Sequence, residues 1–191
     1  MGKRLFIAVD LSREARLLSA AFTRGLQERY PASSIRWELP DKHHITLKFL
    51  GSVPETEVPD VRQAIENVGK VTPPFEMTLE GAGIFPDAKR PRVIWLGVST
   101  GRSELAKIVK NLDSALSTLS FPKEKPAFHP HCTIGRIKHF GDARRAVEQA
   151  ATSSFGPVTW TVEEITLYES ILSPTGSTYR PVDRVTLLET I

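Results

Sequence analysis

The chain has 191 residues, of which 40% are hydrophobic and 25% are charged, and its formal net charge at pH 7 is +3. These values are typical of a globular protein with a sizeable core, and no apolar run approaches the length of a membrane-spanning helix. The single cysteine, Cys132, excludes an internal disulfide. Because the sequence also opens without a signal-peptide core, we expect a cytoplasmic protein with no membrane partner. The mild positive charge is compatible with a polyanionic partner but does not require one.

Hydrophobic periodicity and turn residues predict the elements of the first half of the chain. The helix that follows Ser12 is expected to place Ala15, Leu18 and Leu26 on its apolar face. In chain order the first half is expected to contain a strand at 4–11, a helix at 12–30, an extended segment at 35–37, a strand at 44–50, a helix at 55–68 and a strand at 75–80.

The second half begins again with a strand and a helix. Its expected elements are a strand at 92–98, a helix at 103–119, a loop with Pro and Lys at 121–128, a strand at 131–136, a helix at 142–151, and strands at 160–162, 165–170 and 179–188. Arg4 precedes His44 by 40 residues, and Arg92 precedes His131 by 39. This agreement predicts an internal duplication with pseudo-twofold symmetry.

The order of the elements predicts an α+β fold within one domain, 1–191. We expect a bilobal arrangement in which two antiparallel sheets face a central cleft and helices cover the outer faces. The repeat halves are expected at about 3–90 and 91–191.

Two short motifs of the form His-x-Thr stand at equivalent places in the two halves, His44-Ile45-Thr46 and His131-Cys132-Thr133. Both lie in β-prone segments, where alternate side chains share a face. Lys48 is therefore expected on the face of His44. Arg136 falls on the face opposite His131 unless a bulge or kink at Gly135 turns it back. The twofold could set both histidines across one cleft.

Two imidazoles and two threonine hydroxyls suit displacement at phosphorus. One imidazole can deprotonate an attacking water while the other protonates the oxygen that leaves. The hydroxyls of Thr46 and Thr133 can donate hydrogen bonds to the phosphoryl oxygens, and Lys48 and Arg136 are candidates for additional positive charge. A 2′,3′-cyclic phosphate suits such a site, because its strained ring can open without a metal.

The chain resembles the two-histidine phosphoesterases, and within them the RNA 2′,3′-cyclic phosphodiesterases, first named 2′-5′ RNA ligases. The resemblance rests on the opening strand at 4–8, the segments 44–51 and 129–136 that hold the motifs, the middle segments 83–86 and 93–97, and Ser170, Gly176 and Tyr179 near the end.

This resemblance implies a bilobal fold and hydrolysis of RNA 2′,3′-cyclic phosphate ends to 2′-phosphates without a metal or cofactor. It implies that His44 is the proton donor, that His131 is the proton acceptor, and that Thr46, Thr133 and Arg136 bind the phosphate. The expected partner is RNA with a cyclic phosphate end, such as a tRNA half, or a small cyclic nucleotide, and we expect a monomer.

Three other functions stay open at this point. His129, His131 and His44 could hold zinc in a metallohydrolase, although Pro130 places His129 at or before the start of its strand. The chain could be a non-catalytic RNA-binding module. The same fold could also carry another reaction, such as 2′-5′ ligation or hydrolysis of a different cyclic phosphate.

Several other residues have an ordinary structural interpretation. Alternation puts Cys132 in the core rather than in a site as a nucleophile. Trp37, Phe85 and Tyr179 could stack on a nucleobase, although aromatic residues are more often part of a core.

Overall fold

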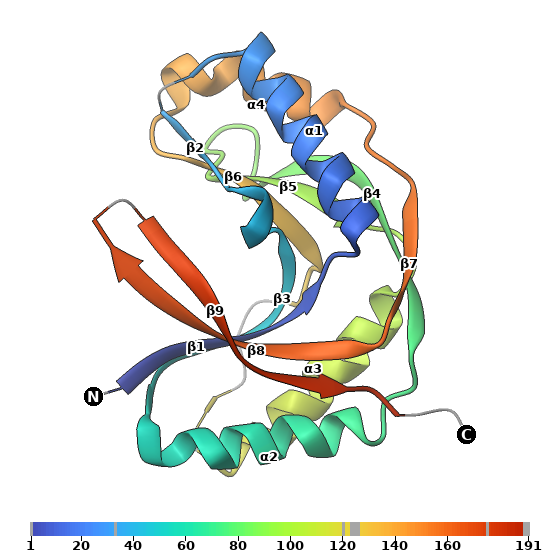
Figure 1. Ribbon diagram of the computed structural model, residues 1–191. Coiled ribbons are helices and arrows are strands. Elements are labelled where there is room, and N and C mark those ends of the chain that lie inside the picture. Colours follow the sequence, from blue (N-terminus) through green and yellow to red (C-terminus); the bar gives the residue numbers. More distant parts are fainter. Residues whose placement is uncertain (1, 33, 120, 123–126, 175, 189–191) are drawn as a thin grey trace.

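The computed structural model of the protein describes residues 2–32, 34–119, 121–122, 127–174 and 176–188. The loop predicted at 121–128 lies partly outside the described residues, since 123–126 are not among them. Figure 1 shows a curled sheet with helices at both ends. The helices are α1 (Arg13–Arg29), α2 (Val58–Gly69), α3 (Arg102–Ser117) and α4 (Phe140–Thr152), with short 3-10 turns at Pro40–Lys42 and Glu55–Glu57.

The strands of the described chain pair antiparallel. They are β1 (Gly2–Asp10), β2 (Ile35–Trp37), β3 (His44–Pro54), β4 (Phe75–Phe85), β5 (Val93–Val98), β6 (His131–Ile137), β7 (Val158–Val162), β8 (Glu164–Ser173) and β9 (Gly176–Thr186). Their order is β7-β4-β5-β6-β3-β1-β8-β9, with β2 on β6. The α+β prediction is confirmed, but the two expected sheets are one continuous sheet. Along the strand order, the part formed by β7, β4, β5 and β6 joins the part formed by β3, β1, β8 and β9 where β6 pairs with β3, through the residue pair Ile45 and Cys132.

The six central strands are arranged symmetrically about the junction of β3 and β6. From this junction, the strands follow as β3, β1 and β8 in one direction and as β6, β5 and β4 in the other, so that each strand has a counterpart at the same distance from the junction. The strands of the first sequence half are divided between the two ends of the sheet, since β1 and β3 lie at one end and β4 at the other. The internal duplication stays a prediction, and this strand order is the one that it would produce.

The helices cover the outside of the curl. Helices α1 and α4 pack against each other and against β7 and β4, whereas α2 and α3 pack together beside β8, β9 and β3 (Figure 1). The apolar core fills the space between the sheet and these helices, and β1 is buried on both faces from Leu5 to Val9. Within the described part of the chain, no helix is long and apolar enough to cross a membrane.

Helix α1 differs from its expected packing. Its start is as predicted, since the Ser12 hydroxyl accepts a hydrogen bond from the Ala15 amide at 3.1 Å. Leu18, however, is 44% exposed, and the buried side includes Ser19. The reason is a polar contact, because the Ser19 hydroxyl is hydrogen-bonded to Nδ1 of buried His43 at 2.8 Å. The inward face is therefore rotated away from Leu18.

Candidate active site

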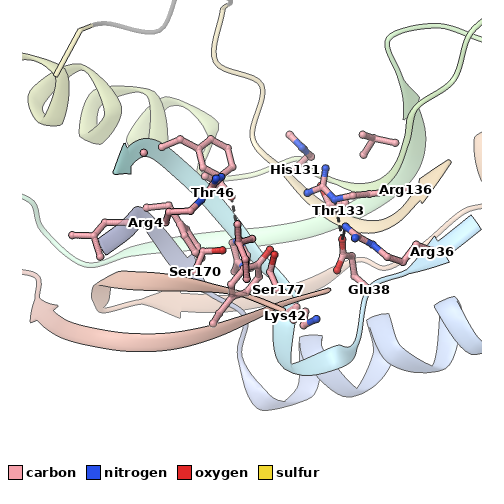
Figure 2. A pocket seen from close by; sticks show the side chains of 18 residues that line it. Arg4, Arg36, Glu38, Lys42, Thr46, His131, Thr133, Arg136, Ser170 and Ser177 are labelled. Carbon is pink, nitrogen blue, oxygen red and sulfur yellow. Dashed lines mark hydrogen bonds and ion pairs between the residues drawn. The ribbon is translucent and has the colours of Figure 1, made fainter. Parts of the chain in front are cut away.

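The two His-x-Thr motifs line the same pocket. His44 and Thr46 enter it from β3, and His131 and Thr133 enter it from β6. The pocket has a volume of about 510 Å³ and lies inside the curl of the sheet. Figure 2 shows Thr46, His131 and Thr133 around this space. The prediction that both imidazoles face one cleft is therefore confirmed.

An extra residue directly after the threonine of each motif decides which basic side chain enters the pocket. In β6 the pairing with β5 passes from Thr133 to Gly135, so Ile134 is a bulge. Arg136 consequently lies on the same side as Thr133 and lines the pocket. The sequence predicts this turn at Gly135, one residue later than the structure has it. A side-chain carbon on Gly135 would approach the Trp37 ring to 3.2 Å, so this glycine serves close packing.

A corresponding bulge in β3 turns Lys48 away from the pocket. Pairing with β1 passes from Thr46 to Lys48, so Leu47 is the extra residue. Lys48 turns into the core, where its side chain is 1% exposed. Its Nζ lies 2.6 Å from Asp113 Oδ1 and 2.8 Å from the Pro122 carbonyl oxygen. The prediction that Lys48 shares the face of His44 is wrong, and Phe49 lines the pocket instead.

His131 is oriented by a backbone carbonyl. Its Nδ1 lies 2.7 Å from the His129 carbonyl oxygen and must carry a proton to donate to it. In the neutral ring Nε2 then holds the free lone pair, which is the requirement for a general base. The Phe85 ring contacts this imidazole edge to face at 5.0 Å between centroids. Burial lowers the pKa of His131 below its usual value, against the opposing effect of its bond to His129.

His44 is enclosed by aromatic rings. The Phe6 ring lies 5.0 Å and the Tyr179 ring 5.4 Å from its imidazole, between centroids. Its Nε2 is 3.1 Å from the Thr46 hydroxyl. Burial lowers the pKa of His44 to about 4, although the charge of Asp10 and a hydrogen bond to the Lys42 carbonyl both act to raise it. The imidazole is therefore uncharged at neutral pH.

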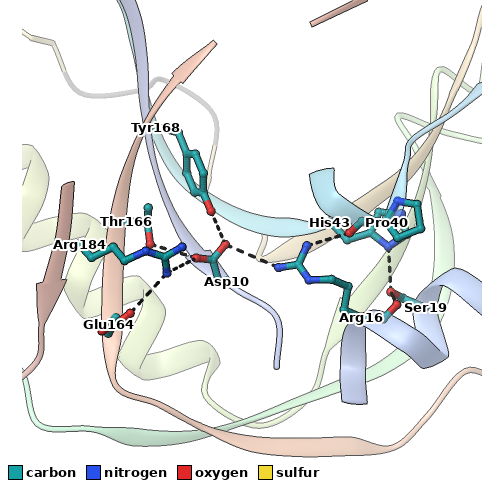
Figure 3. A network of polar contacts seen from close by, with 9 residues as sticks. All are labelled: Asp10, Arg16, Ser19, Pro40, His43, Glu164, Thr166, Tyr168 and Arg184. Carbon is teal, nitrogen blue, oxygen red and sulfur yellow. Dashed lines mark hydrogen bonds and ion pairs between the residues drawn. The ribbon is translucent and has the colours of Figure 1, made fainter. Parts of the chain in front are cut away.

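Asp10 is the carboxylate that opposes the effect of burial on His44. It pairs with His44 across β1 and β3. Figure 3 shows that it is held from several sides. The Tyr168 hydroxyl donates to it at 2.7 Å, the Thr166 hydroxyl at 3.1 Å and Arg184 at 3.3 Å, and Arg16 lies at 3.9 Å. These contacts fix the position of a negative charge beside the first motif.

Positive side chains surround the rest of the pocket. Arg36 and Arg136 share the largely buried Glu38, at 3.6 and 2.9 Å. Lys42 lies over the Tyr179 ring, 6.0 Å from its centroid. Cations at this density favour an anionic ligand. The sequence does not indicate Arg36, Glu38 or Lys42 as site residues, because no motif contains them and only the fold brings β2 and the turn after it to the pocket.

The zinc alternative is not supported by the positions of the histidines. Among the described residues, no group of three or more His, Cys, Asp or Glu side chains could hold a metal ion. His129 precedes β6, as Pro130 indicated, and lines the neighbouring pockets rather than the one that contains His44. Cys132 is fully buried, as predicted, and burial raises its pKa to about 12.

The family model described as the 2′-5′ RNA ligase superfamily matches residues 9–172. The chain belongs to this superfamily. The RNA 2′,3′-cyclic phosphodiesterase of Thermotoga maritima is 32% identical over 178 residues, which cover 93% of this chain and 91% of the relative. The protein of the same name from Archaeoglobus fulgidus is 33% identical and covers 93% and 96%. The resemblance inferred from the two motifs is thus confirmed.

A solved structure of a superfamily member has the same fold. E. coli LigT complexed with 3′-AMP superimposes with a TM-score of 0.80 at 26% identity, covering 99% of this chain and all of LigT. The superfamily match contains both motifs but ends before β9, which supplies Ser177 and Tyr179 to the pocket. Of the proposed base-stacking residues, Tyr179 lines this pocket, Phe85 lines the two adjacent ones, and Trp37 packs against the core.

Proposed function

We propose that the protein hydrolyses RNA 2′,3′-cyclic phosphate ends to 2′-phosphates without a metal. The observation that carries this proposal is the single pocket shared by both His-x-Thr motifs and Arg136. The names of the superfamily relatives support the same substrate class. Since one chain supplies every residue named for the reaction, we expect the monomer to be active.

In this reaction His131 would act as the base and His44 as the acid. A water oxygen attacks phosphorus while Nε2 of His131 takes one of its protons. The bond from phosphorus to the 3′ oxygen breaks, and His44 supplies the proton that this oxygen needs. The products are a 2′-phosphomonoester and a 3′-hydroxyl. The His131 assignment agrees with the bond from its Nδ1 to the His129 carbonyl, which leaves Nε2 unprotonated.

His44 must be charged to act as the acid, and its pKa of about 4 is too low for this. The bound phosphate is negative and would raise that pKa, because a neighbouring opposite charge favours the protonated ring. Substrate binding and protonation of His44 are therefore coupled. This coupling would keep the acid uncharged until an anion occupies the pocket.

The other polar side chains would hold the phosphate. The hydroxyls of Thr46 and Thr133 can donate to its two non-bridging oxygens. Arg136 uses Nε to bind Glu38, so its terminal nitrogens stay available to the pocket. Charge that develops on the phosphoryl oxygens in the transition state would be stabilised by these donors.

The direct test is incubation with an oligoribonucleotide that ends in a 2′,3′-cyclic phosphate, in EDTA, with the product phosphate located by mass spectrometry and enzymatic mapping. The expected product is the 2′-phosphate. His44→Ala and His131→Ala should each abolish turnover while circular dichroism shows an intact fold. Binding without turnover by the wild type, or loss of activity in EDTA alone, would contradict the proposal. Joined RNA, in a reaction that also contains a 5′-hydroxyl acceptor, would favour ligation instead.

A substrate with sulfur in place of the bridging 3′ oxygen tests the two roles separately. A thiolate leaves without a proton, so this substrate should restore turnover to His44→Ala but not to His131→Ala. Rescue of His131→Ala alone would reverse the assignment.

A further inference from the structure

One end of the pocket carries polar side chains that the reaction does not use. Arg4 on β1, Ser170 on β8 and Ser177 on β9 all line it. The strands that hold them are neighbours, since Leu5 pairs with Glu169 and Leu172 pairs with Ser177. In Figure 2 these three side chains lie on the side away from Arg36 and Arg136.

The three side chains have no partner within the described part of the chain. No side-chain hydrogen bond or ion pair engages Arg4, Ser170 or Ser177 there. Arg36 and Arg136 differ, because both are bound to Glu38. A guanidinium and two hydroxyls that face a pocket without internal partners are available to a ligand, and the guanidinium fork matches the oxygens of a phosphate.

The position of this group in the pocket separates it from the two histidines. β1 pairs Asp10 with His44, and Arg4 lies six residues before Asp10 on the same strand. Phe6, whose ring is 5.0 Å from the His44 imidazole, lies between them on β1. A phosphate held by Arg4 would therefore lie farther along the pocket than the reacting phosphate rather than on it.

We propose that Arg4, Ser170 and Ser177 form a subsite for the phosphodiester that precedes the terminal nucleotide of the RNA. The inference rests on the proposed function, because it takes the cyclic phosphate to lie between His44 and His131. It narrows the substrate class, since a cyclic mononucleotide has no internucleotide phosphate to occupy this subsite. The preferred substrate is then a polymer end.

Three substrates separate this subsite from the reaction itself. They are a cyclic mononucleotide, a dinucleotide ending in the cyclic phosphate, and the same dinucleotide with an uncharged methylphosphonate linkage. The wild type should open the charged dinucleotide with a kcat/KM about tenfold above the other two, on the scale of one charge-assisted contact. Arg4→Gln should bring all three to the lower value. Its kcat/KM for the charged dinucleotide should also depend less steeply on salt, by about 0.7 in the log–log slope.

Lys3→Gln is the matched control. Lys3 is next to Arg4 in the sequence and carries the same charge, but its side chain does not line the pocket. It should keep the preference for the charged dinucleotide. Ser170→Ala and Ser177→Ala should each reduce that preference. Equal kcat/KM of the wild type for all three substrates would overturn the subsite, as would loss of the preference in Arg36→Gln but not in Arg4→Gln.

A binding experiment keeps the two proposals apart. Calorimetric titration with a dinucleotide that ends in a 2′-phosphate, and with its methylphosphonate analogue, requires no turnover. If the wild type opened none of the substrates, the proposed function would fail, while tighter binding of the charged dinucleotide, lost in Arg4→Gln, would still support the subsite. Equal binding of both dinucleotides would overturn the subsite even if turnover were normal.

Discussion

Replacing Asp113 by Asn should destabilise the protein much more than replacing Lys48 by Met. The Lys48 side chain is 1% exposed, and its ammonium has Asp113 at 2.6 Å and one carbonyl oxygen at 2.8 Å. Without the carboxylate, a buried charge has no counter-charge, and the cost is about 3–5 kcal/mol. Asp113 is 15% exposed, so water reaches it when Lys48 is replaced. Methionine also fills much of the volume, so about 1–2 kcal/mol is expected.

Urea denaturation of the wild type and both variants measures this difference in the free energy of unfolding, and thermal denaturation measures the accompanying change in Tm. At about 2–4 °C per kcal/mol for a chain of this size, Asp113→Asn should lower Tm by about 6–20 °C. The double replacement Lys48→Met, Asp113→Leu should recover much of the loss, because both charges are removed together. Arg144→Ala breaks an exposed ion pair with Glu148 and should change stability little.

Lys48→Met also tests the corrected position of Lys48. If Lys48 is structural, this variant loses far less activity on a cyclic phosphate than His44→Ala. A structural role for Lys48 is refuted if Lys48→Met destabilises the protein as much as Asp113→Asn, or if it abolishes turnover while the fold is intact.

The remaining predictions concern protons. In an NMR titration of the empty protein, the His44 ring should titrate near pH 4 and His131 below the usual 6.5. Because the unfolded chain binds protons that folded His44 excludes, stability should fall by about 3 kcal/mol as pH drops from 6.5 to 4, and a flat profile would contradict this. Asp10→Asn should lower the pKa of His44 further, and an unchanged midpoint in the same titration would show that Asp10 does not act on it. Cys132 should resist a thiol reagent until urea unfolds the chain; rapid labelling of the native protein would contradict its burial.

The sequence predicts the elements well where their pattern is local. The helices and strands appear in the expected order. In each motif, strict alternation also places the histidine and the threonine correctly on the face that lines the pocket. What local pattern cannot show is the long-range pairing. The union of two sheets into one depends on the contact of Ile45 with Cys132, which are 87 residues apart and carry no signal of their pairing.

The errors at the site have the same origin. Lys48 was placed by strict alternation, and a bulge is a property of two paired strands, so one strand alone does not indicate it. Leu18 was placed by apolar periodicity, although the buried Ser19 is needed by His43 from a distant segment. Arg4 was seen only as the start of a strand, because its neighbours Ser170 and Ser177 come from the other end of the chain.

The matched extra residues at Leu47 and Ile134 bear on how such a centre could be transplanted. In a regular host strand with the same sequence, Phe49 and Arg136 would point toward the core and Lys48 would point toward the ligand. A graft into a regular strand should therefore omit Leu47 and Ile134. Without these two extra residues, plain alternation after each threonine places Lys48 and Gly135 toward the core and Phe49 and Arg136 toward the ligand, as they lie here.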